Sequence, residues 1–234
     1  MKFGGTSLED EKARQHAYRH IKEGLKKAKV LVVVSAMGRY PAPYATDTLL
    51  SMGSDKCSKE EKARLVSMGE QLSALIVAGE LLDQGVSAYA LPYNKNGILT
   101  DCNYEYAKVL SLSPRCIKQA FVQHDIVVAS GFIAQAPCGD VTTLGRGGSD
   151  FSAVLFADML GLKEVEIYTD VDGVYDIDPK LSPRAVRYER LTYDAMLNMK
   201  VRVLHERCVK YAKKKGIRIH LRGTFADGEG TIVA

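Results

Sequence analysis

The chain has 234 residues, of which 46% are hydrophobic and 26% charged, proportions typical of a soluble globular domain with one sizeable core. Its net charge of +4 is too small to indicate a nucleic-acid partner. The five cysteines are scattered without a C-x-x-C pair, which favours free thiols over disulfides or a metal site. Without a signal-peptide pattern or an apolar run near the roughly 20 residues of a membrane span, we expect a cytoplasmic protein that contacts no membrane.

Helix and strand patterns alternate from the N-terminus. Residues 7–28 predict a helix with Ser7 as its N-cap, acidic residues in its first turn and lysines in its last. Residues 29–37 form a continuous apolar, β-branched run, which is typical of a strand buried on both faces. Residues 58–85 predict a long helix that begins with a capping box at Ser58.

The middle of the chain continues this alternation. Residues 86–92 and 126–132 predict two further strands. The helix predicted between them, over residues 113–125, carries Pro114 at its first position. A glycine-rich stretch, residues 142–161, then predicts a turn followed by another helix.

The last third of the chain follows the same pattern. Residues 164–170 predict a strand and residues 191–199 a helix. Residues 205–216 predict a second helix, and residues 217–223 the strand that closes the sheet. Because strands separated by helices pair in parallel, we predict an α/β fold, a three-layer αβα sandwich around a mainly parallel sheet, in a single domain of residues 1–234.

The sequence TLGRGGSD, residues 143–150, stands at the start of the helix in the glycine-rich stretch. Its three glycines allow positive φ and the close approach of a ligand to the backbone. Ser149 or Asp150 can cap the helix, whose first N–H groups and positive dipole end attract an anion. Arg146 adds a forked donor that suits a carboxylate or phosphate. The stretch predicts an anion-binding turn, with a glycine-rich hairpin and an ordinary helix cap as the alternative.

A second glycine turn, KFGGTS, occupies residues 2–7. Gly4 and Gly5 precede the first predicted helix, and Lys2 places a positive charge beside them. A tight turn between a strand and a helix is the alternative for this stretch. Together, the two turns suit one anionic cosubstrate and one anionic acceptor, and neither is a Walker A loop.

The acidic stretch YTDVDGVYDIDPK, residues 168–180, follows a predicted strand. Its aspartates surround Gly173, but the pattern lacks the terminal glutamate of a calcium-binding EF-hand loop. The stretch is either a solvated acidic turn or a loop whose carboxylates hold a ribose or a base while Tyr175 stacks on it.

These motifs resemble those of aspartokinases, members of the amino-acid kinase family. KFGGTS, VVVSAMG, YATDTLLS, TLGRGGSD, TDVDGVYDIDPK and RVLHERCV occur in the aspartokinase order, from residue 2 to about residue 233. The combination of KFGGTS with GRGGSD is specific to aspartokinases, whereas acetylglutamate, uridylate and carbamate kinases share only the fold and the first glycine pair. The resemblance implies the amino-acid kinase fold and ATP-dependent phosphorylation of the β-carboxylate of L-aspartate to 4-phospho-L-aspartate. That reaction is the first step toward lysine, threonine, methionine and diaminopimelate.

The resemblance also implies a role for individual residues. Lys2 would neutralise the transferring phosphoryl group, Asp150 would orient Lys2, and Arg202 would contact the phosphates. The remaining nucleotide-binding residues would be Phe3, Gly4, Gly5, Thr169, Asp170, Tyr175 and Lys180. The acceptor would be bound by Thr46, Asp47, Glu70, Arg146, Gly147, Gly148 and Ser149. The implied cofactors are ATP and Mg²⁺, with Mg²⁺ carried mainly by the phosphates rather than by protein ligands.

Within the acceptor group, Arg146 would clamp a carboxylate of aspartate and Glu70 would bind its α-ammonium group. Acceptor binding would fall in the N-terminal part, to about residue 150, and nucleotide binding in residues 151–234. A homodimer is implied as well. Aspartokinases usually continue into a pair of ACT regulatory domains, and this chain ends where the kinase domain would end, so we expect no feedback inhibition from within the chain.

Three departures from the aspartokinase pattern leave alternatives open. Arg202 stands where a phosphate-binding lysine is usual, and the two side chains are not interchangeable at a phosphate. The strand before Lys2 is so short that we expect Lys2 to be weakly anchored. Residues 98–109 lack a histidine that is usual near Tyr104. The alternatives are a related kinase with another small carboxylate or phosphate acceptor, and a nucleotide-binding homologue with weakened catalysis.

Overall fold

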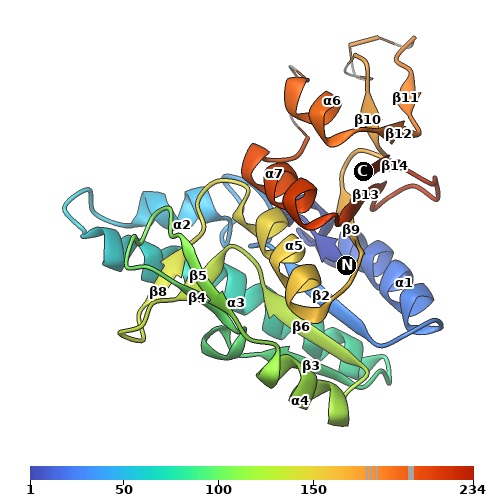
Figure 1. The fold of residues 1–234 in the computed structure, drawn as a ribbon. Coiled ribbons are helices and arrows are strands. Elements are labelled where there is room, and N and C mark those ends of the chain that lie inside the picture. The colour runs from blue at the N-terminus through green and yellow to red at the C-terminus, as the bar shows by residue number, and fades with distance from the viewer. Residues whose placement is uncertain (178, 180, 183, 200–202) are drawn as a thin grey trace.

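An eight-stranded sheet forms the centre of the computed structural model, which describes residues 1–177, 179, 181–182, 184–199 and 203–234 (Figure 1). In spatial order its strands are β12 (Arg190–Leu191), β14 (Thr231–Val233), β13 (Arg218–Gly223), β9 (Glu164–Thr169), β1 (Lys2–Phe3), β2 (Val30–Val34), β6 (Ile126–Ser130) and β3 (Ala88–Leu91). Neighbouring strands pair in parallel, except for the antiparallel pair of β13 and β14. The predicted mainly parallel sheet is confirmed.

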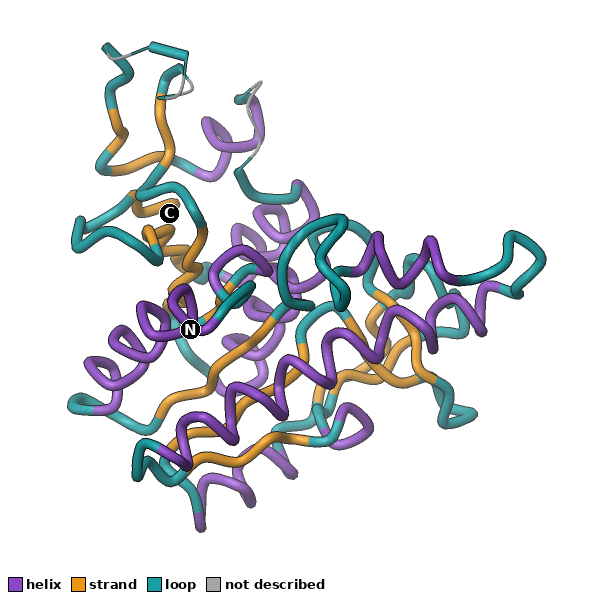
Figure 2. The backbone as a smooth tube through the Cα atoms, turned by 180° about the vertical axis from the view of Figure 1, so that it is seen from behind, coloured by secondary structure: helices purple, strands orange, loops and turns teal. Residues whose placement is uncertain are grey.

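Helices cover both faces of this sheet, as the two opposite views show (Figures 1 and 2). One face carries α1 (Glu11–Leu25) and α3 (Lys59–Asp83). The other face carries α4 (Arg115–Gln123), α5 (Gly148–Leu160) and α7 (Glu206–Lys215). The arrangement confirms the three-layer αβα sandwich.

The β2 strand shows how one apolar run serves both layers. Val32 and Val34 pack with α1 and α3, whereas Val33 between them packs on the face that carries α5. This alternation follows from the two-residue period of a strand, and it explains why the run has no polar residue. Burying each valine stabilises the fold by roughly 1.5–3 kcal/mol.

A smaller four-stranded sheet lies beside the main one and was not predicted. Its order is β5 (Val109–Leu112), β4 (Ile98–Thr100), β7 (Ile133–Gln135) and β8 (Val141–Thr143). The hydroxyl groups of Thr100 and Thr142 lie 2.6 Å apart in its buried interior. Since β8 leads directly into the glycine-rich turn before α5, this sheet fixes where that turn lies.

The remaining elements are short. Helix α2 (Thr46–Met52) packs against α3. The two-stranded hairpin of β10 (Val174–Tyr175) and β11 (Arg187–Tyr188) projects with α6 (Tyr193–Asn198) at the upper end of Figure 1. Two single-turn 3₁₀ helices, η1 (Gly5–Ser7) and η2 (Tyr93–Lys95), complete the described elements.

The start of the first helix differs from the prediction. Helix α1 begins at Glu11, and its N-cap is Asp10, whose Oδ1 accepts a hydrogen bond from the Ala13 N–H at 2.7 Å. Ser7 is instead buried, with its hydroxyl 2.6 Å from that of Thr224. The 3₁₀ turn η1 begins at Gly5 and includes Ser7, so the helix starts later and Asp10 caps it.

Other helix ends agree more closely with the sequence. Ser58 and Glu61 form the predicted capping box at the start of α3. Pro114 occupies the N-cap position of α4, one residue earlier than expected. The strand over residues 217–223 was predicted to close the sheet. In the structure this strand is β13, and β14 lies beyond it in the sheet.

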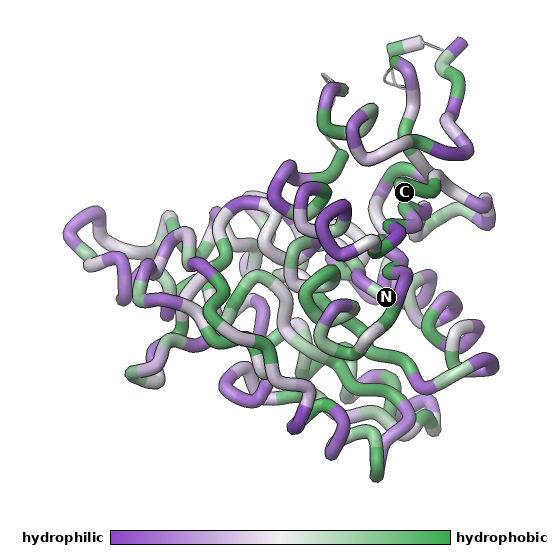
Figure 3. The backbone as a smooth tube through the Cα atoms, in the orientation of Figure 1, coloured by the Kyte–Doolittle hydropathy of each residue, from purple (hydrophilic) through white to green (hydrophobic). Residues whose placement is uncertain are grey.

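Helix α3 combines length with high hydropathy. It has 25 residues and a mean hydropathy of 1.4 over its most apolar window, which by length and composition alone would suffice for a membrane span. Half of that window is buried inside the protein, where the hydropathy colouring shows apolar residues concentrated along the central strands (Figure 3). The apolar side of α3 is therefore used to cover the sheet.

Candidate functional site

Lys2 lies at the centre of the eight-stranded sheet. Although β1 has only two residues, it pairs in parallel with both neighbours, so that Lys2 is in register with Val33 of β2 and Ile167 of β9. The Lys2 side chain is 10% exposed, and its Nζ lies 2.7 Å from Oδ1 of Asp150. The expectation of a weakly anchored Lys2 is therefore wrong, because two flanking strands and an ion pair hold it.

Asp150 belongs to the first turn of α5 and approaches Lys2 from the face that this helix covers. Its Oδ1 is buried and makes no well-aligned hydrogen bond, so the contact with Lys2 is held by charge. Removing two charges from water costs several kcal/mol, which their mutual attraction offsets only in part. A buried pair of this kind in a cleft is typical of a functional centre.

The turn before α5 begins the helix without a side-chain cap. Gly147 is the N-cap residue, with φ 69° and ψ 15°, so the prediction of Ser149 or Asp150 as the cap is wrong. A Cβ at Gly147 would lie 2.3 Å from Cβ of His205, which explains the glycine. The backbone N–H groups of Ser149 and Asp150 find no acceptor among the described residues. The amides that attract an anion are thus left free at this helix end.

A cavity of about 500 Å³ opens in front of this turn. Lys2, Gly5 and Asp150 line this cavity. All seven residues predicted for the acceptor line it as well: Thr46, Asp47, Glu70, Arg146, Gly147, Gly148 and Ser149. The Arg146 side chain is exposed and forms no hydrogen bond or ion pair with any residue that the structure describes. A guanidinium free at the cavity wall suits a ligand carboxylate.

Glu70 reaches the same cavity from the middle of α3 and is buried. Burial raises the pKa of Glu70 to about 8, while a hydrogen bond from the Ala36 backbone and the charge of Lys2 oppose the shift only partly. Its Oε2 has no hydrogen-bond partner among the described residues. A ligand ammonium group would satisfy this oxygen and favour the ionised carboxylate.

A second cavity, of about 200 Å³, lies on the side of the first glycine turn. Gly4 and Thr169 line it together with Arg39. Some residues line both this cavity and the larger one of about 500 Å³, which we call the acceptor-side cavity because it contains the residues predicted for the acceptor. The shared residues are Lys2, Gly5, Ser35, Gly38 and Asp150. The ion pair of Lys2 and Asp150 therefore stands where the two cavities meet.

Close approach of the backbone explains the glycine at position 5. A Cβ on Gly5 would lie 2.6 Å from the carbonyl oxygen of Gly38, in the loop after β2. Gly4 continues the ladder, since its N–H donates to the carbonyl oxygen of Tyr168 at 3.3 Å. The 3₁₀ helix η1 therefore forms this turn. The N-terminus of α1 was predicted to face the ligand, and this prediction is wrong, because no residue of that helix lines the cavity.

Several residues predicted to bind the nucleotide lie outside both cavities. The Phe3 side chain is fully buried and stacks on Tyr168, so only its backbone could meet a ligand. Asp170 accepts a hydrogen bond from the Thr169 hydroxyl and forms an ion pair with Arg39 at 3.2 Å. Tyr175, in the β10–β11 hairpin, donates to Asp172 at 2.7 Å. Lys180 and Arg202 are outside the described residues.

The lining of the larger cavity also includes residues that were not predicted as site residues, among them Lys62, Tyr104, Glu105 and Phe132. Lys62 could have been found from its spacing, because it stands eight residues before Glu70 with Val66 midway, on one face of α3. Tyr104 falls in the stretch that departs from the aspartokinase pattern, where its hydroxyl donates to Asp140 at 2.9 Å. The departure therefore lies in the wall of the cavity.

The described residues include no group of three or more histidines, cysteines or acidic residues that could hold a metal ion. The five cysteines are free. His205 caps α7, since its Nδ1 accepts a hydrogen bond from the Arg207 backbone.

The chain matches the amino acid kinase family over residues 1–223. Among curated proteins it is 38% identical over 240 residues to aspartokinase 1 of Bacillus subtilis and 40% identical over 242 residues to an aspartokinase of Thermus thermophilus. Both matches cover the whole chain but only 59% and 58% of the relatives, so the chain spans less than two thirds of their length.

Solved structures show the same likeness. The aspartate kinase of Synechocystis superposes with a TM-score of 0.86 at 32% identity, covering 100% of this chain and 39% of that one. Aspartokinase III of E. coli, in complex with aspartate and ADP, has a TM-score of 0.80 at 24% identity over 99% of this chain and 63% of that one. At that identity, the second likeness is one of fold.

Proposed function

The chain belongs to the amino acid kinase family, and we propose that it transfers the γ-phosphoryl group of ATP to the β-carboxylate of L-aspartate, giving 4-phospho-L-aspartate and ADP. The observation that carries the proposal is the position of the Lys2–Asp150 ion pair at the junction of two cavities. A phosphoryl group moving from a donor in one cavity to an acceptor in the other would pass this cation. Similarity to aspartokinases over the whole chain supports aspartate as the acceptor.

The acceptor-side cavity has complementary groups for the charges of aspartate. Arg146 would bind one of the carboxylates through its unpaired guanidinium, aided by the free N–H groups of Ser149 and Asp150. Glu70 would bind the α-ammonium group, which supplies the partner that its Oε2 lacks. Thr46 and Asp47, at the start of α2, would complete the wall of the pocket.

The nucleotide would lie on the side of the smaller cavity. Gly4 and Gly5 line this cavity, and Lys2 would contact the transferring group. Thr169 lines this cavity at the carboxyl end of β9, and its hydroxyl donates a hydrogen bond to Asp170. Both residues would lie near the nucleotide. We propose Phe3, Gly4, Tyr175, Lys180 and Arg202 as further nucleotide contacts from the aspartokinase resemblance.

Mg²⁺ fits this site as an ion carried by the phosphates. Asp150 is committed to Lys2, and the described residues hold no cluster of metal ligands, so the donor set suits a cation that keeps waters and binds phosphate oxygens. When bound, Mg²⁺ would neutralise charge on the nucleotide phosphates. Lys2 would neutralise charge on the transferring group itself.

The reaction needs positioning and charge neutralisation rather than a general base. The aspartate β-carboxylate is already ionised at neutral pH, so no proton has to be removed before attack. A carboxylate oxygen forms the new bond to the γ-phosphorus while the bond from that phosphorus to the β,γ-bridging oxygen breaks, and ADP leaves. Arg146 would hold the acceptor in line, and Lys2 would stabilise the charge on the equatorial oxygens.

A coupled assay of ADP release tests the proposal. The purified chain is supplied with ATP, Mg²⁺ and either L-aspartate or a panel of other small carboxylates and phosphates. We expect turnover with L-aspartate and none with L-asparagine, which lacks the β-carboxylate. Turnover only with another acceptor would replace aspartate in the proposal, and nucleotide binding without turnover would contradict the kinase activity.

We also propose that the protein is a cytoplasmic homodimer. Helix α3 exposes Met68, Leu75 and Leu82, with exposed fractions of 60%, 62% and 54%. Their seven-residue spacing places them in one stripe along the helix. A second copy can cover such a stripe with its own, as a two-fold interface requires.

A further inference from the structure

Arg207 lies in the first turn of α7 and lines neither cavity of the candidate site. Its side chain is partly buried, and the guanidinium carbon lies 4.6 Å from the ring centre of Tyr106 and 4.4 Å from that of Phe151. A guanidinium over an aromatic ring is attracted to the face of that ring. The two rings therefore hold the Arg207 side chain in place.

The same guanidinium binds two separate segments of the chain. Its Nη1 donates to the Leu144 carbonyl oxygen at 2.9 Å, and its Nη2 donates to the Ala107 carbonyl oxygen at 2.6 Å. Leu144 directly precedes the glycine turn of residues 145–148, and Ala107 closely follows residues 104–105. Both of these short segments line the acceptor-side cavity. The planar fork of one arginine thus ties two parts of the cavity wall to α7.

The glycine turn makes few backbone hydrogen bonds of its own. Within the part of the chain that the structure describes, the N–H groups of Gly145, Arg146 and Gly147 donate to no acceptor. Gly145 and Gly147 both have positive φ, 78° and 69°, a region in which glycine carries no steric penalty. The position of the turn therefore depends on the residues that pack against it.

Tyr106 and His205 flank the turn. A Cβ on Gly145 would lie 2.1 Å from Cδ2 of Tyr106. A Cβ on Gly147 would lie 2.3 Å from Cβ of His205. Both flanking residues contact Arg207, because its guanidinium lies over the Tyr106 ring and its backbone N–H donates to His205 Nδ1 at 3.3 Å. Contacts from the start of α7 thus hold the turn at both of its positive-φ glycines.

We propose that Arg207 is a positioning residue for the acceptor, which holds the glycine turn so that Arg146 meets the ligand carboxylate. Arg207 does not itself touch the ligand. The inference rests on the proposed function, because it takes the acceptor-side cavity as the aspartate site. Since displacement of a binding group by about 1 Å can cost up to roughly 10²-fold, loss of the Arg207 guanidinium should weaken aspartate binding from outside the cavity.

The variant Arg207→Met removes the guanidinium and keeps an unbranched side chain beside the rings. We expect KM for aspartate to rise by roughly tenfold, because the turn is no longer fixed. The kcat and the KM for ATP should change by less than about threefold, since the Lys2–Asp150 pair keeps its own contacts. A fall in kcat at unchanged KM for aspartate would overturn the proposal.

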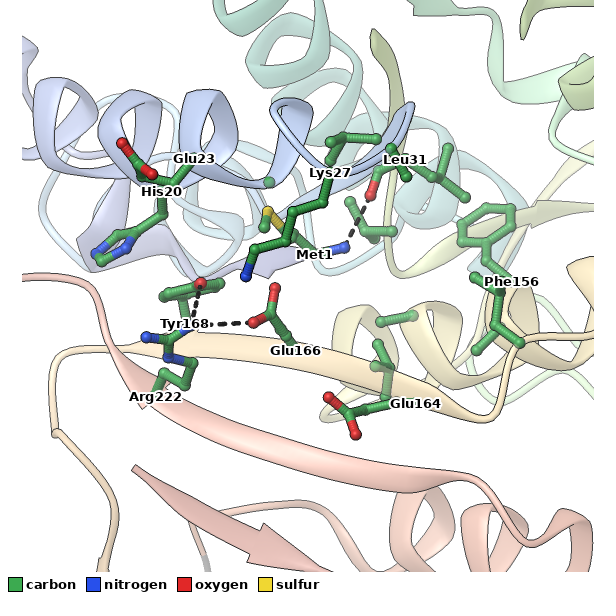
Figure 4. A pocket seen from close by; sticks show the side chains of 18 of the residues that line it. Met1, His20, Glu23, Lys27, Leu31, Phe156, Glu164, Glu166, Tyr168 and Arg222 are labelled. Carbon is green, nitrogen blue, oxygen red and sulfur yellow. Dashed lines mark hydrogen bonds and ion pairs between the residues drawn. The ribbon is translucent and has the colours of Figure 1, made fainter. Parts of the chain in front are cut away.

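Arg222, on β13, provides the matched control. It donates to Glu166 at 3.0 Å and to the Tyr168 hydroxyl at 3.2 Å, and its guanidinium carbon lies 5.6 Å from the Tyr168 ring centre. Figure 4 shows these side chains beside a different cavity, whose lining includes neither Lys2 nor Asp150. Arg222→Met should leave KM for aspartate unchanged. An equal rise of this KM in both variants would indicate general destabilisation and would overturn the proposal.

A double-variant cycle tests whether Arg207 acts through Arg146. If it does, the effect of Arg207→Met on aspartate affinity, measured by calorimetry, should shrink from about tenfold to about twofold in the Arg146→Ala background. Additive losses would show that Arg207 acts independently of Arg146, contrary to the proposal.

Hydrogen exchange tests the positioning of the turn without any ligand. The Gly148 N–H donates to the Gly145 carbonyl oxygen across the turn at 2.9 Å. Its exchange should be roughly tenfold faster in Arg207→Met than in Arg222→Met. If the wild-type chain bound no aspartate, the proposed function would fail, whereas faster exchange at Gly148 would still support a turn held by Arg207. Equal exchange in the two variants would overturn the proposal in either case.

Discussion

Lys2 Nζ and Asp150 Oδ1 lie 2.7 Å apart in the stretch of wall where the two described cavities of the site meet. Both side chains are largely buried, with exposed fractions of 10% and 14%. One partner comes from the centre of the sheet and the other from the first turn of α5, so the pair joins the walls of the two cavities.

The charge of Lys2 should matter more to catalysis than to acceptor binding. Lys2→Met is expected to lower kcat by about 10³-fold or more, because a well-placed cation contributes roughly 10³–10⁵ in phosphoryl transfer. Binding of L-aspartate, measured by calorimetry, should change little. A comparable loss of aspartate affinity would show that Lys2 binds the acceptor directly.

Unfolding measurements separate the structural role of this pair from its catalytic role. Asp150→Asn leaves the Lys2 cation buried without a counter-ion and should cost about 3–5 kcal/mol in the free energy of unfolding. The double variant Lys2→Met/Asp150→Leu removes both charges and should recover most of that stability without recovering turnover. Urea titration of the wild type, Asp150→Asn and the double variant supplies the comparison, and a double variant as unstable as Asp150→Asn would contradict it.

Arg146 should act on the acceptor. Arg146→Ala removes a charge-assisted hydrogen bond worth about 1.5–3 kcal/mol, so KM for aspartate should rise by roughly tenfold to a hundredfold. The KM for ATP should stay near its original value. Arg115→Ala, an exposed arginine at the start of α4, is the matched control and should change neither constant. If Arg146→Ala weakened ATP and aspartate alike, the division between the two cavities would be wrong.

Binding of aspartate should depend on the ionisation of Glu70. Its pKa is raised to about 8, so the ligand-free carboxyl is mostly protonated at pH 7, whereas an ammonium group binds the ionised form. Affinity for aspartate should therefore rise with pH by up to about tenfold per unit below pH 8 and level off above it. Calorimetry at pH 7 in buffers of different ionisation enthalpy should detect nearly one proton released per aspartate bound.

The Glu70→Gln variant provides the control for this pH dependence. It keeps the size of the side chain but cannot ionise, so aspartate should bind more weakly at pH 8 and with a flat profile between pH 6 and 8. A wild-type profile that is equally flat, or proton uptake on binding, would show that Glu70 is not the group that meets the ammonium.

The α3 stripe gives a test of the proposed dimer. Leu75→Lys places a charge in the middle of the stripe and should convert the dimer to a monomer in light scattering at micromolar concentration. Leu110→Lys, on β5, changes a leucine of similar exposure, 59% against 62%, and should leave the dimer intact. A wild-type chain that is monomeric under these conditions would contradict the proposal.

Local chemistry explains which features were predictable. The β-branched run of β2 and the capping box at Ser58 depend on neighbouring residues, so the sequence alone indicates them correctly. The four-stranded second sheet escaped because its strands have only three or four residues, and because its two hairpins are joined by the pairing of β4 with β7, which is distant in the chain. Asp10 replaced Ser7 as the helix cap because Ser7 pairs with Thr224, a contact invisible to local reasoning.

The candidate site shows the same division. Motif order was enough to select the seven residues predicted for the acceptor, which the structure brings together in the lining of one cavity. It was not enough to find Lys62 or to foresee how firmly Lys2 is held, since both depend on which strands and helices become neighbours. The shortness of β1 predicts a weakly anchored Lys2 only as long as the pairing of β1 with β2 and β9 is unknown.

Gly147 should be irreplaceable for steric reasons as well as for its backbone conformation. Gly161, at the end of α5, has nearly the same φ, 72° against 69°, but a Cβ there would meet nothing within 4 Å, whereas at Gly147 it would lie 2.3 Å from His205. Gly161→Ala should therefore cost only the roughly 1–2 kcal/mol of a left-handed alanine. Gly147→Ala should cost more in unfolding free energy and should also raise KM for aspartate, because relief of the clash must move the turn that carries Arg146. Equal stabilities of the two variants, with unchanged KM in both, would mean that the turn can shift without disturbing the acceptor pocket.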